Sequence, residues 1–164
     1  MPVEIERKFL VADDGWRSGV VRSEHFRQGY LATTATASVR VRVGGGRAWL
    51  SVKGRVVGPS RAEYEYEVPL AEANEMLDAM CDEGRLEKVR HWVVVDGHEW
   101  EIDEFLGRNA GLVVAELEIE HEDARFTRPA WLGREVTDDV RYYNASLAQL
   151  PYDSWSRETG GEDA

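Results

Sequence analysis

Charged residues recur at alternate positions in several segments of this 164-residue chain. The acidic pairs are Glu4 with Glu6 and Glu116 with Glu118, and the basic pairs are Arg40 with Arg42 and Lys88 with Arg90. Side chains two apart on a β-strand point to the same face, where like charges repel each other. Each pair therefore needs a partner of opposite charge to be stable.

Both kinds of pair have a natural ligand. Carboxylates that share a face can bind one hard cation such as Mg²⁺ or Mn²⁺, which prefers oxygen ligands. Neighbouring arginine and lysine side chains can bind the oxygens of a phosphate chain through charge-assisted hydrogen bonds. A surface that carries both kinds of pair is suited to a metal-bridged polyphosphate.

The charged face of the predicted strands is almost purely acidic and basic. Its bases are Lys8, Arg40, Arg42, Lys53, Arg55, Lys88 and Arg90, and its acids are Glu4, Glu6, Glu63, Glu65, Glu67, Glu101, Asp103, Glu116, Glu118 and Glu120. In an ordinary antiparallel sheet such a face is solvent-exposed and the apolar face forms the core. The concentration of charge instead favours a sheet closed into a barrel, with the charged face lining the lumen and the apolar face packed outside.

The elements that would position these residues are mostly strands. Alternation and turn signals predict strands at Val3–Val11, 24–31, Ser38–Val43, 47–54, Arg61–Val68, 86–95, 98–105 and 112–121. Helices are expected at 71–83 and at about 137–149, the second with Thr137 as its N-cap. The fold class is therefore α+β and mainly antiparallel β. We expect one domain over residues 1–150 and a flexible tail over 151–164, in which Trp155 is a candidate for docking.

Composition narrows the classes of function. The net charge of −11 argues against general binding of nucleic acid or of an anionic membrane. No apolar run is long enough to span a bilayer and no signal peptide is evident, so a cytoplasmic location is expected. The single cysteine, Cys81, is expected in the core, and the four histidines lack the spacing of a transition-metal site.

The first predicted strand also resembles a known signature. Its pattern Glu4-x-Glu6-x-Lys8 is similar to the start of the CYTH superfamily, the triphosphate tunnel metalloenzymes. The similarity continues in order along roughly residues 3 to 150, through Gln28-Gly29-Tyr30-Leu31, Val39-Arg40-Val41-Arg42, Lys53, Arg61-x-Glu63-Tyr64-Glu65, Glu87-Lys88-x-Arg90, Trp100 to Phe105, Ala115 to Glu118, Gly133 to Asp138 and Tyr142-x-Asn144.

This resemblance implies a closed, eight-stranded antiparallel tunnel barrel and a set of site residues. Metal ligands would be Glu4, Glu6, Glu116 and Glu118, with Glu63 and Asp103 as second-site or water-mediated acids. Phosphate contacts would be Lys8, Arg40, Arg42, Lys53, Lys88 and Arg90. Tyr30 would orient or activate water, and the catalytic set would be Lys8, Tyr30, Lys53, Glu63 and Asp103. Some family members carry a lysine where this chain has Tyr143.

The expected activity is hydrolysis of inorganic triphosphate to diphosphate and phosphate, with Mg²⁺ or Mn²⁺ as cofactor. Adenylate cyclase activity, or hydrolysis of a nucleoside triphosphate or thiamine triphosphate, is the alternative within the same superfamily. A non-catalytic module that binds polyphosphate or nucleotides is a further alternative, although anion binding alone does not need so many carboxylates. The sequence leaves open which residue is the general base and whether the protein forms a homodimer.

Overall fold

Strands dominate the computed structural model, which describes residues 3–81 and 84–155. The strands are β1 (Val3–Val11), β2 (Val20–Thr33), β3 (Ala37–Gly44), β4 (Arg47–Gly54), β5 (Ser60–Val68), β6 (Arg85–Val95), β7 (His98–Phe105), β8 (Val113–Glu118) and β9 (Leu132–Glu135). The α-helices are α1 (Leu70–Met80) and α2 (Asn144–Gln149). Short 3₁₀ turns lie at Gly15–Gly19, Gly107–Asn109, Val140–Tyr142 and Tyr152–Ser154.

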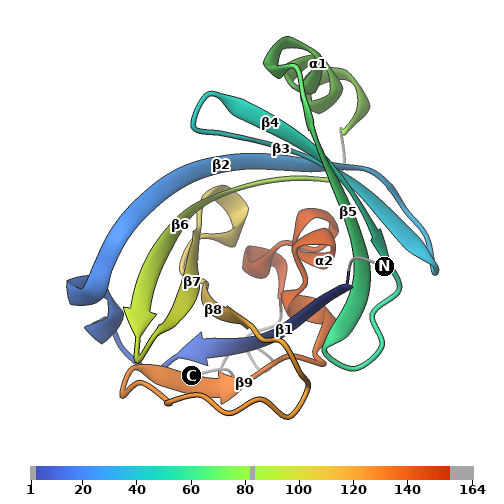
Figure 1. The fold of residues 1–164 in the computed structure, drawn as a ribbon. Coiled ribbons are helices and arrows are strands. Elements are labelled where there is room, and N and C mark those ends of the chain that lie inside the picture. Colours follow the sequence, from blue (N-terminus) through green and yellow to red (C-terminus); the bar gives the residue numbers. More distant parts are fainter. Residues whose placement is uncertain (1–2, 82–83, 156–164) are drawn as a thin grey trace.

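The first eight strands close into a ring. Their order is β5-β4-β3-β2-β6-β7-β8-β1, and antiparallel pairing of β1 with β5, in which Glu4 lies opposite Arg61, completes the circle. Figure 1 looks approximately along the axis of this ring. The ninth strand, β9, adds to the outside of the ring by pairing with β1. The expected closed antiparallel barrel of eight strands is confirmed.

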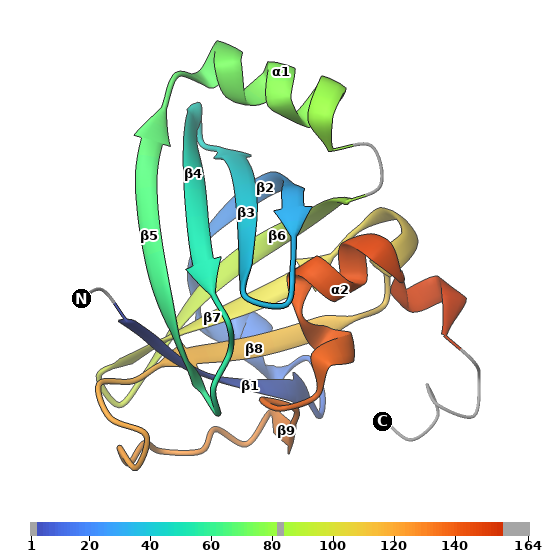
Figure 2. The same ribbon diagram turned by 90° about the vertical axis from the view of Figure 1, so that its right-hand side faces the viewer.

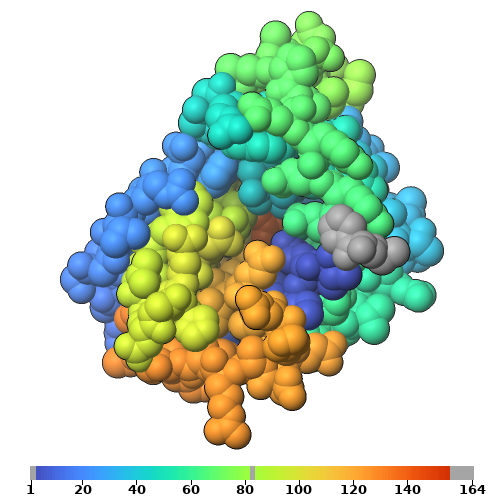
Figure 3. Space-filling view, in the orientation of Figure 1, coloured from blue at the N-terminus to red at the C-terminus, as the bar shows by residue number. Residues whose placement is uncertain are grey.

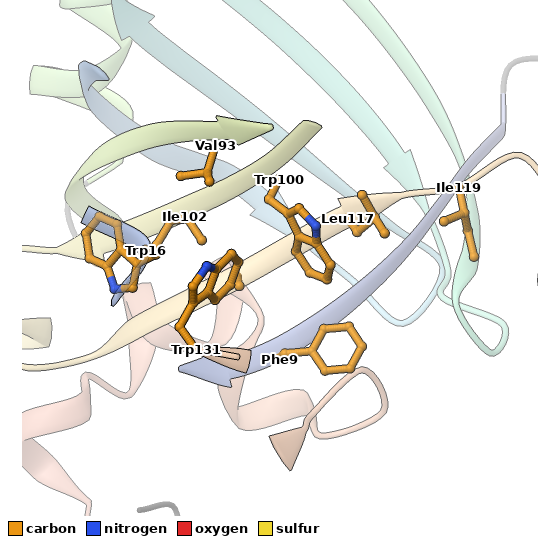
Figure 4. Close-up of a cluster of buried hydrophobic side chains, with 9 residues drawn as sticks. Phe9, Trp16, Val93, Trp100, Ile102, Leu117, Ile119 and Trp131 are labelled. Carbon is orange, nitrogen blue, oxygen red and sulfur yellow. The ribbon is translucent and has the colours of Figure 1, made fainter. Parts of the chain in front are cut away.

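Apolar side chains on the outer face of the barrel form two of the three hydrophobic clusters. One cluster lies outside β1, β7 and β8, where Phe9, Trp100 and Trp131 pack edge to face (Figure 4). Under α1, Leu77 and Cys81 pack against β3 and β4. Phe9 and Trp100 alternate with Lys8 and Glu101, so the apolar faces point outward and the charged faces point inward.

The lumen changes from charged to apolar along its length. Leu10, Leu86 and Val114 lie on the same strand faces as Lys8, Lys88 and Glu116, but they join a third cluster of buried apolar residues. Tyr142 and Leu147, from the segment that ends in α2, complete this cluster. In Figure 1, α2 lies inside the outline of the ring, and Figure 2 shows it from the side. One end of the barrel is thus filled by apolar packing.

The predicted helix at 137–149 is wrong over its first half. Residues Leu132–Glu135 form β9, the 3₁₀ turn follows, and α2 begins only at Asn144. Thr137 is not an N-cap, because its hydroxyl oxygen accepts a hydrogen bond from the backbone N–H of Lys8 (3.0 Å). Gly133 allows this close docking, since a Cβ atom there would lie 2.9 Å from the carbonyl oxygen of Leu10. Hydrogen bonds of Val136 and Thr137 with Lys8 therefore hold the start of the predicted helix against β1, and a 3₁₀ turn follows at Val140–Tyr142.

The boundaries of the other helices and strands differ less from the predicted ones. Strand β2 begins at Val20 instead of residue 24, β8 ends at Glu118 instead of residue 121, and α1 ends at Met80 within the described residues. At the C-terminal end, the ring of Trp155 packs edge-on against Tyr142 at 5.2 Å and against Tyr152 at 5.1 Å. The rest of the expected tail, 156–164, lies outside the described residues. None of the helices in the described part of the chain has the length and apolarity needed to cross a membrane.

Candidate active site in the barrel lumen

The charged half of the lumen encloses a cavity of about 230 Å³. Figure 3 shows its opening, with the red atoms of the C-terminal region visible deep inside. Twelve of the predicted site residues line the cavity: Glu4, Glu6, Lys8, Tyr30, Arg40, Arg42, Lys53, Glu63, Lys88, Arg90, Glu116 and Glu118. Acidic and basic side chains line it in equal number. The barrel therefore brings together residues that are spread over seven strands.

Buried cations form one side of the site. Lys88 is 1% exposed and Arg40 5% exposed, which places charged groups where water cannot fully solvate them. Carboxylates compensate them only in part. Arg40 lies 3.7 Å from Glu65, and its guanidinium donates a hydrogen bond to the hydroxyl of Ser51 (3.2 Å). Such partly compensated cations favour the binding of an anion.

Arg42 is the least compensated of these cations. No carboxylate of the described residues lies within ion-pair distance of its guanidinium, whose Nε donates to the side-chain oxygen of Gln28 (3.2 Å). Burial and repulsion by Arg40 and Arg90 lower the pKa of Arg42 to about 9. The group therefore remains charged at neutral pH and is available to a phosphate oxygen.

Asp103, expected from the sequence to be a second-site or water-mediated acid, does not line the cavity. The carboxylate is 0% exposed, and its two oxygens accept hydrogen bonds from Lys88 Nζ (2.6 Å), Arg90 Nε (2.8 Å) and Arg90 Nη2 (2.9 Å). Burial alone would raise the pKa of Asp103, but Arg90 and Lys88 hold it below its ordinary value. Asp103 thus orients the side chains of Lys88 and Arg90 from behind.

A cluster of three carboxylates faces these cations. Glu6, Glu101 and Glu116 each offer an oxygen atom, and these atoms lie within 4.8 Å of one another. Burial and the charges of Glu116 and Glu4 raise the pKa of Glu6 well above its ordinary value. Burial would also raise the pKa of Glu116, but the charges of Lys8, Arg90 and Lys88 hold this pKa well below its ordinary value. Crowded carboxylates of this kind fit a divalent cation, which would relieve their repulsion.

Glu101 was missing from the predicted metal ligands. It stands opposite Glu116 in the pairing of β7 with β8 and contacts Arg90 at 3.2 Å. The alternation of side chains along β7 placed Glu101 on the charged face. Spacing within that one strand could not show that its carboxylate lies beside those of Glu6 and Glu116. Asp103, two residues further along, has the same parity and is covered by Lys88 and Arg90.

The remaining predicted acids line the cavity outside this cluster. Glu4 and Glu63 both contact Lys53, at 3.4 and 3.1 Å. Glu118 is more exposed, and burial together with Glu4, Glu101 and Glu63 raises its pKa. The pKa of Lys53 is lowered by burial and by Arg40. These residues form a second group of acids around one lysine.

Two tyrosines also border the cavity. Tyr30 lies opposite Arg40 in the pairing of β2 with β3, so it stands beside the basic side of the lumen. The ring of Tyr143 lies 5.2 Å from Lys8 Nζ, and its hydroxyl donates to the carbonyl oxygen of Thr137 (3.2 Å). Tyr143 therefore contacts the site through Lys8, at the position where some family members carry a lysine.

A second cavity, of about 820 Å³, adjoins the apolar end of the barrel. It is larger, but two of the arginines on its wall already have acidic partners. Arg108 pairs with Asp153 at 3.0 Å, and Arg27 lies 3.7 Å from Asp78. The lumen cavity, in which buried cations face crowded carboxylates, is therefore the stronger candidate for chemistry.

Comparison with known proteins identifies the family. The sequence model of the family described as "CYTH domain" matches residues 2–149, nearly the whole chain. The chain belongs to the CYTH family. The resemblance noted in the first strand is thus confirmed, and the charged lumen described above is the lumen of a CYTH barrel.

Two curated relatives share this CYTH domain along almost their full length. An inorganic triphosphatase of Acetivibrio thermocellus is 48% identical over 152 residues, which cover 93% of this chain and 97% of the relative. An inorganic triphosphatase of Nitrosomonas europaea is 40% identical over 149 residues, or 88% of this chain and 96% of the relative. The crystal structure of an inorganic triphosphatase, 36% identical, matches 91% of this CYTH chain and 96% of its own with a TM-score of 0.67.

Proposed function

We propose that this protein hydrolyses inorganic triphosphate to diphosphate and phosphate, with a divalent cation, Mg²⁺ or Mn²⁺, bound in the lumen. The observation that carries the proposal is the carboxylate cluster of Glu6, Glu101 and Glu116 beside the buried cations. Relatives named inorganic triphosphatase at 48% and 40% identity support the same reaction.

In this mechanism the chain's own contribution is mainly electrostatic. Arg40, Arg42 and Lys88 bind the phosphate oxygens, neutralise their charge and hold the triphosphate in line for attack by water. Glu6, Glu101 and Glu116 would hold the divalent cation, which when bound would neutralise further charge on the phosphate oxygens and would lower the pKa of a nearby water. Asp103 keeps Lys88 and Arg90 pointed into the lumen.

The other lining residues have supporting roles in the proposal. Lys8 balances Glu116 at 3.7 Å and contacts the phosphate chain. Lys53 binds phosphate near the second group of acids, where Glu63 holds a second cation or a water molecule. Tyr30 orients the attacking water. Each role follows from the position of the side chain on the cavity wall.

The size of the cavity favours inorganic triphosphate over a nucleotide. Pockets for drug-sized ligands typically begin at about 300 Å³, whereas this cavity is about 230 Å³. Its wall is also mostly charged, with no aromatic platform for a base apart from the two tyrosines. Adenylate cyclase or nucleoside triphosphatase activity is therefore the second candidate, and a purely binding role is the third.

A panel of substrates tests this proposal. With Mg²⁺ or Mn²⁺, phosphate release should be faster from inorganic triphosphate than from ATP or thiamine triphosphate, and EDTA should abolish it. Replacing Glu101 by Gln should reduce turnover, whereas replacing the exposed Glu99 on the same strand should not. Full activity in EDTA would contradict the metal requirement, and cyclic AMP as the main product from ATP would contradict the substrate.

Binding should also change the protonation of Lys88. Burial and the charges of Arg90 and Arg42 lower the pKa of Lys88 to about 7, although Asp103 opposes the shift. A triphosphate beside this amine would raise its pKa again, so at pH 8 binding should draw a proton onto Lys88. Metal-free calorimetry in buffers of different ionisation enthalpy measures this uptake. The Lys88→Met variant is the control, and equal uptake by both proteins would exclude Lys88 as the source.

A further inference from the structure

Two side-chain amides connect the phosphate-binding cations to α2. Asn144, the first residue of α2, accepts hydrogen bonds at Oδ1 from Lys88 Nζ (2.8 Å) and from Gln28 Nε2 (2.9 Å). The other end of the Gln28 amide, Oε1, accepts a hydrogen bond from Arg42 Nε (3.2 Å). Gln28 is 0% exposed and lies on β2, between β3 with Arg42 and β6 with Lys88.

The chemistry of the donors allows only one orientation of both amides. The guanidinium group of Arg42 can only donate hydrogen bonds, so Gln28 must turn Oε1 toward it. The NH₂ group of Gln28 then faces Asn144, which must present Oδ1 to it. The same oxygen accepts the hydrogen bond from Lys88 Nζ. Reversing either amide would set one N–H group against another.

We propose that Asn144 and Gln28 are positioning residues, which hold Lys88 and Arg42 in their phosphate-binding orientation and tie both cations to the start of α2. The proposal rests on the proposed binding of triphosphate in the lumen. Arg42 has no carboxylate of the described residues within ion-pair distance. Its guanidinium is oriented by the hydrogen bond to the Gln28 oxygen and by the ring of Phe26, whose centroid lies 4.9 Å from Cζ. A cation held in place before binding loses less conformational freedom when the phosphate arrives.

The simpler alternative is that the amides only help α2 to pack. On that view, changing Asn144 would lower the stability of the fold but would not change binding through Arg42. The two views differ in a measurable way, because Asn144 forms no hydrogen bond with Arg42 and is connected to it through Gln28. Coupling between the two positions is therefore the decisive quantity.

A double-mutant cycle measures this coupling with inorganic triphosphate itself. In EDTA, calorimetry should show that Asn144→Ala weakens triphosphate binding about 5- to 10-fold, as expected for losing about one hydrogen bond to a charged group. The effect should shrink to about twofold in an Arg42→Ala background. In an Arg40→Ala background Asn144→Ala should still weaken binding by the full 5- to 10-fold. Arg40 donates its hydrogen bond to Ser51 and does not belong to the relay, the hydrogen-bonded chain from Asn144 through Gln28 to Arg42. Equal effects in all three backgrounds would overturn the proposal.

A second measurement needs no substrate. In NMR spectra of the unliganded protein, Asn144→Ala should accelerate hydrogen exchange at Arg42 Nε–H and leave other arginine signals unchanged. If Asn144→Ala does not fold, Gln28→Met should give the same result, since it keeps the length of the side chain and the bond between Asn144 and Lys88. Unchanged exchange at Arg42 in a folded variant would overturn the relay. This result stands even if the wild-type protein fails to hydrolyse triphosphate, which would refute only the proposed function.

Discussion

Replacing Glu116 by Gln should reduce turnover of inorganic triphosphate by at least about 100-fold. Loss of a residue that merely supports a metal ligand typically costs 10- to 100-fold, and Glu116 belongs to the carboxylate cluster itself. The change keeps the shape of the side chain but removes the charge that balances Lys8 and Arg90. Phosphate release at saturating triphosphate, together with Mn²⁺ titration followed by electron paramagnetic resonance, measures both effects.

The matched control is Glu120→Gln. Glu120 follows the same alternation as Glu116 and Glu118, but it is exposed and does not line the cavity. Its replacement should leave turnover and Mn²⁺ affinity unchanged. Turnover of Glu116→Gln within threefold of the wild type, with unaltered Mn²⁺ affinity, would show that the cluster does not hold the catalytic cation.

Asp103→Asn should lower the free energy of unfolding by about 3–5 kcal/mol, because it leaves two buried cations, Lys88 and Arg90, without their shared carboxylate. Lys88 and Arg90 are 1% and 7% exposed, so water cannot replace the lost charge. For a chain of this size, the melting temperature should fall by on the order of 10 °C. Thermal unfolding followed by circular dichroism measures the shift. Asp153→Asn, at the exposed ion pair with Arg108, should change stability by less than about 1 kcal/mol.

The pH dependence of this loss has a definite sign. The folded protein holds the pKa of Asp103 below its ordinary value, near 3.9 in an unfolded chain. The stabilisation from the carboxylate is therefore complete above about pH 4 and is lost as the pH falls through the folded-state pKa. The difference in unfolding free energy between wild type and Asp103→Asn should therefore narrow as the pH falls below 4. A difference that widens in acid would contradict this role for Asp103.

The alternation of charge in single strands was enough to predict the closed barrel and most of the residues that line its cavity. Lys8 and Glu116 are 108 positions apart in sequence, yet each lies on the charged face of its strand, and closure brings those faces together. This inference depends only on the two-residue period of a strand, which does not require knowledge of the strand order.

The structure differs from the sequence-based expectations at positions where contacts between neighbouring strands decide where a side chain or a segment lies. Asp103 and Glu101 have the same parity, but only Glu101 reaches the cavity, because Arg90 folds over Asp103. Likewise, β9 formed just before the predicted helix, in a stretch with no predicted element, where Gly133 lets the chain dock on β1. The packing of α2 into the barrel depends on Leu10, Leu86 and Val114, apolar residues that interrupt the charged face at one end.

Closure of the ring by β1 also constrains how the protein is made. In sequence this strand precedes all of its partners, β5, β8 and β9, and its last pairing residues are near position 135. Until then Glu4, Glu6 and Lys8 have no lumen to face, and both edges of the strand lack partners. Contacts so distant in sequence slow folding. The barrel, and with it the carboxylate cluster, can therefore be completed only after β8 has been synthesised.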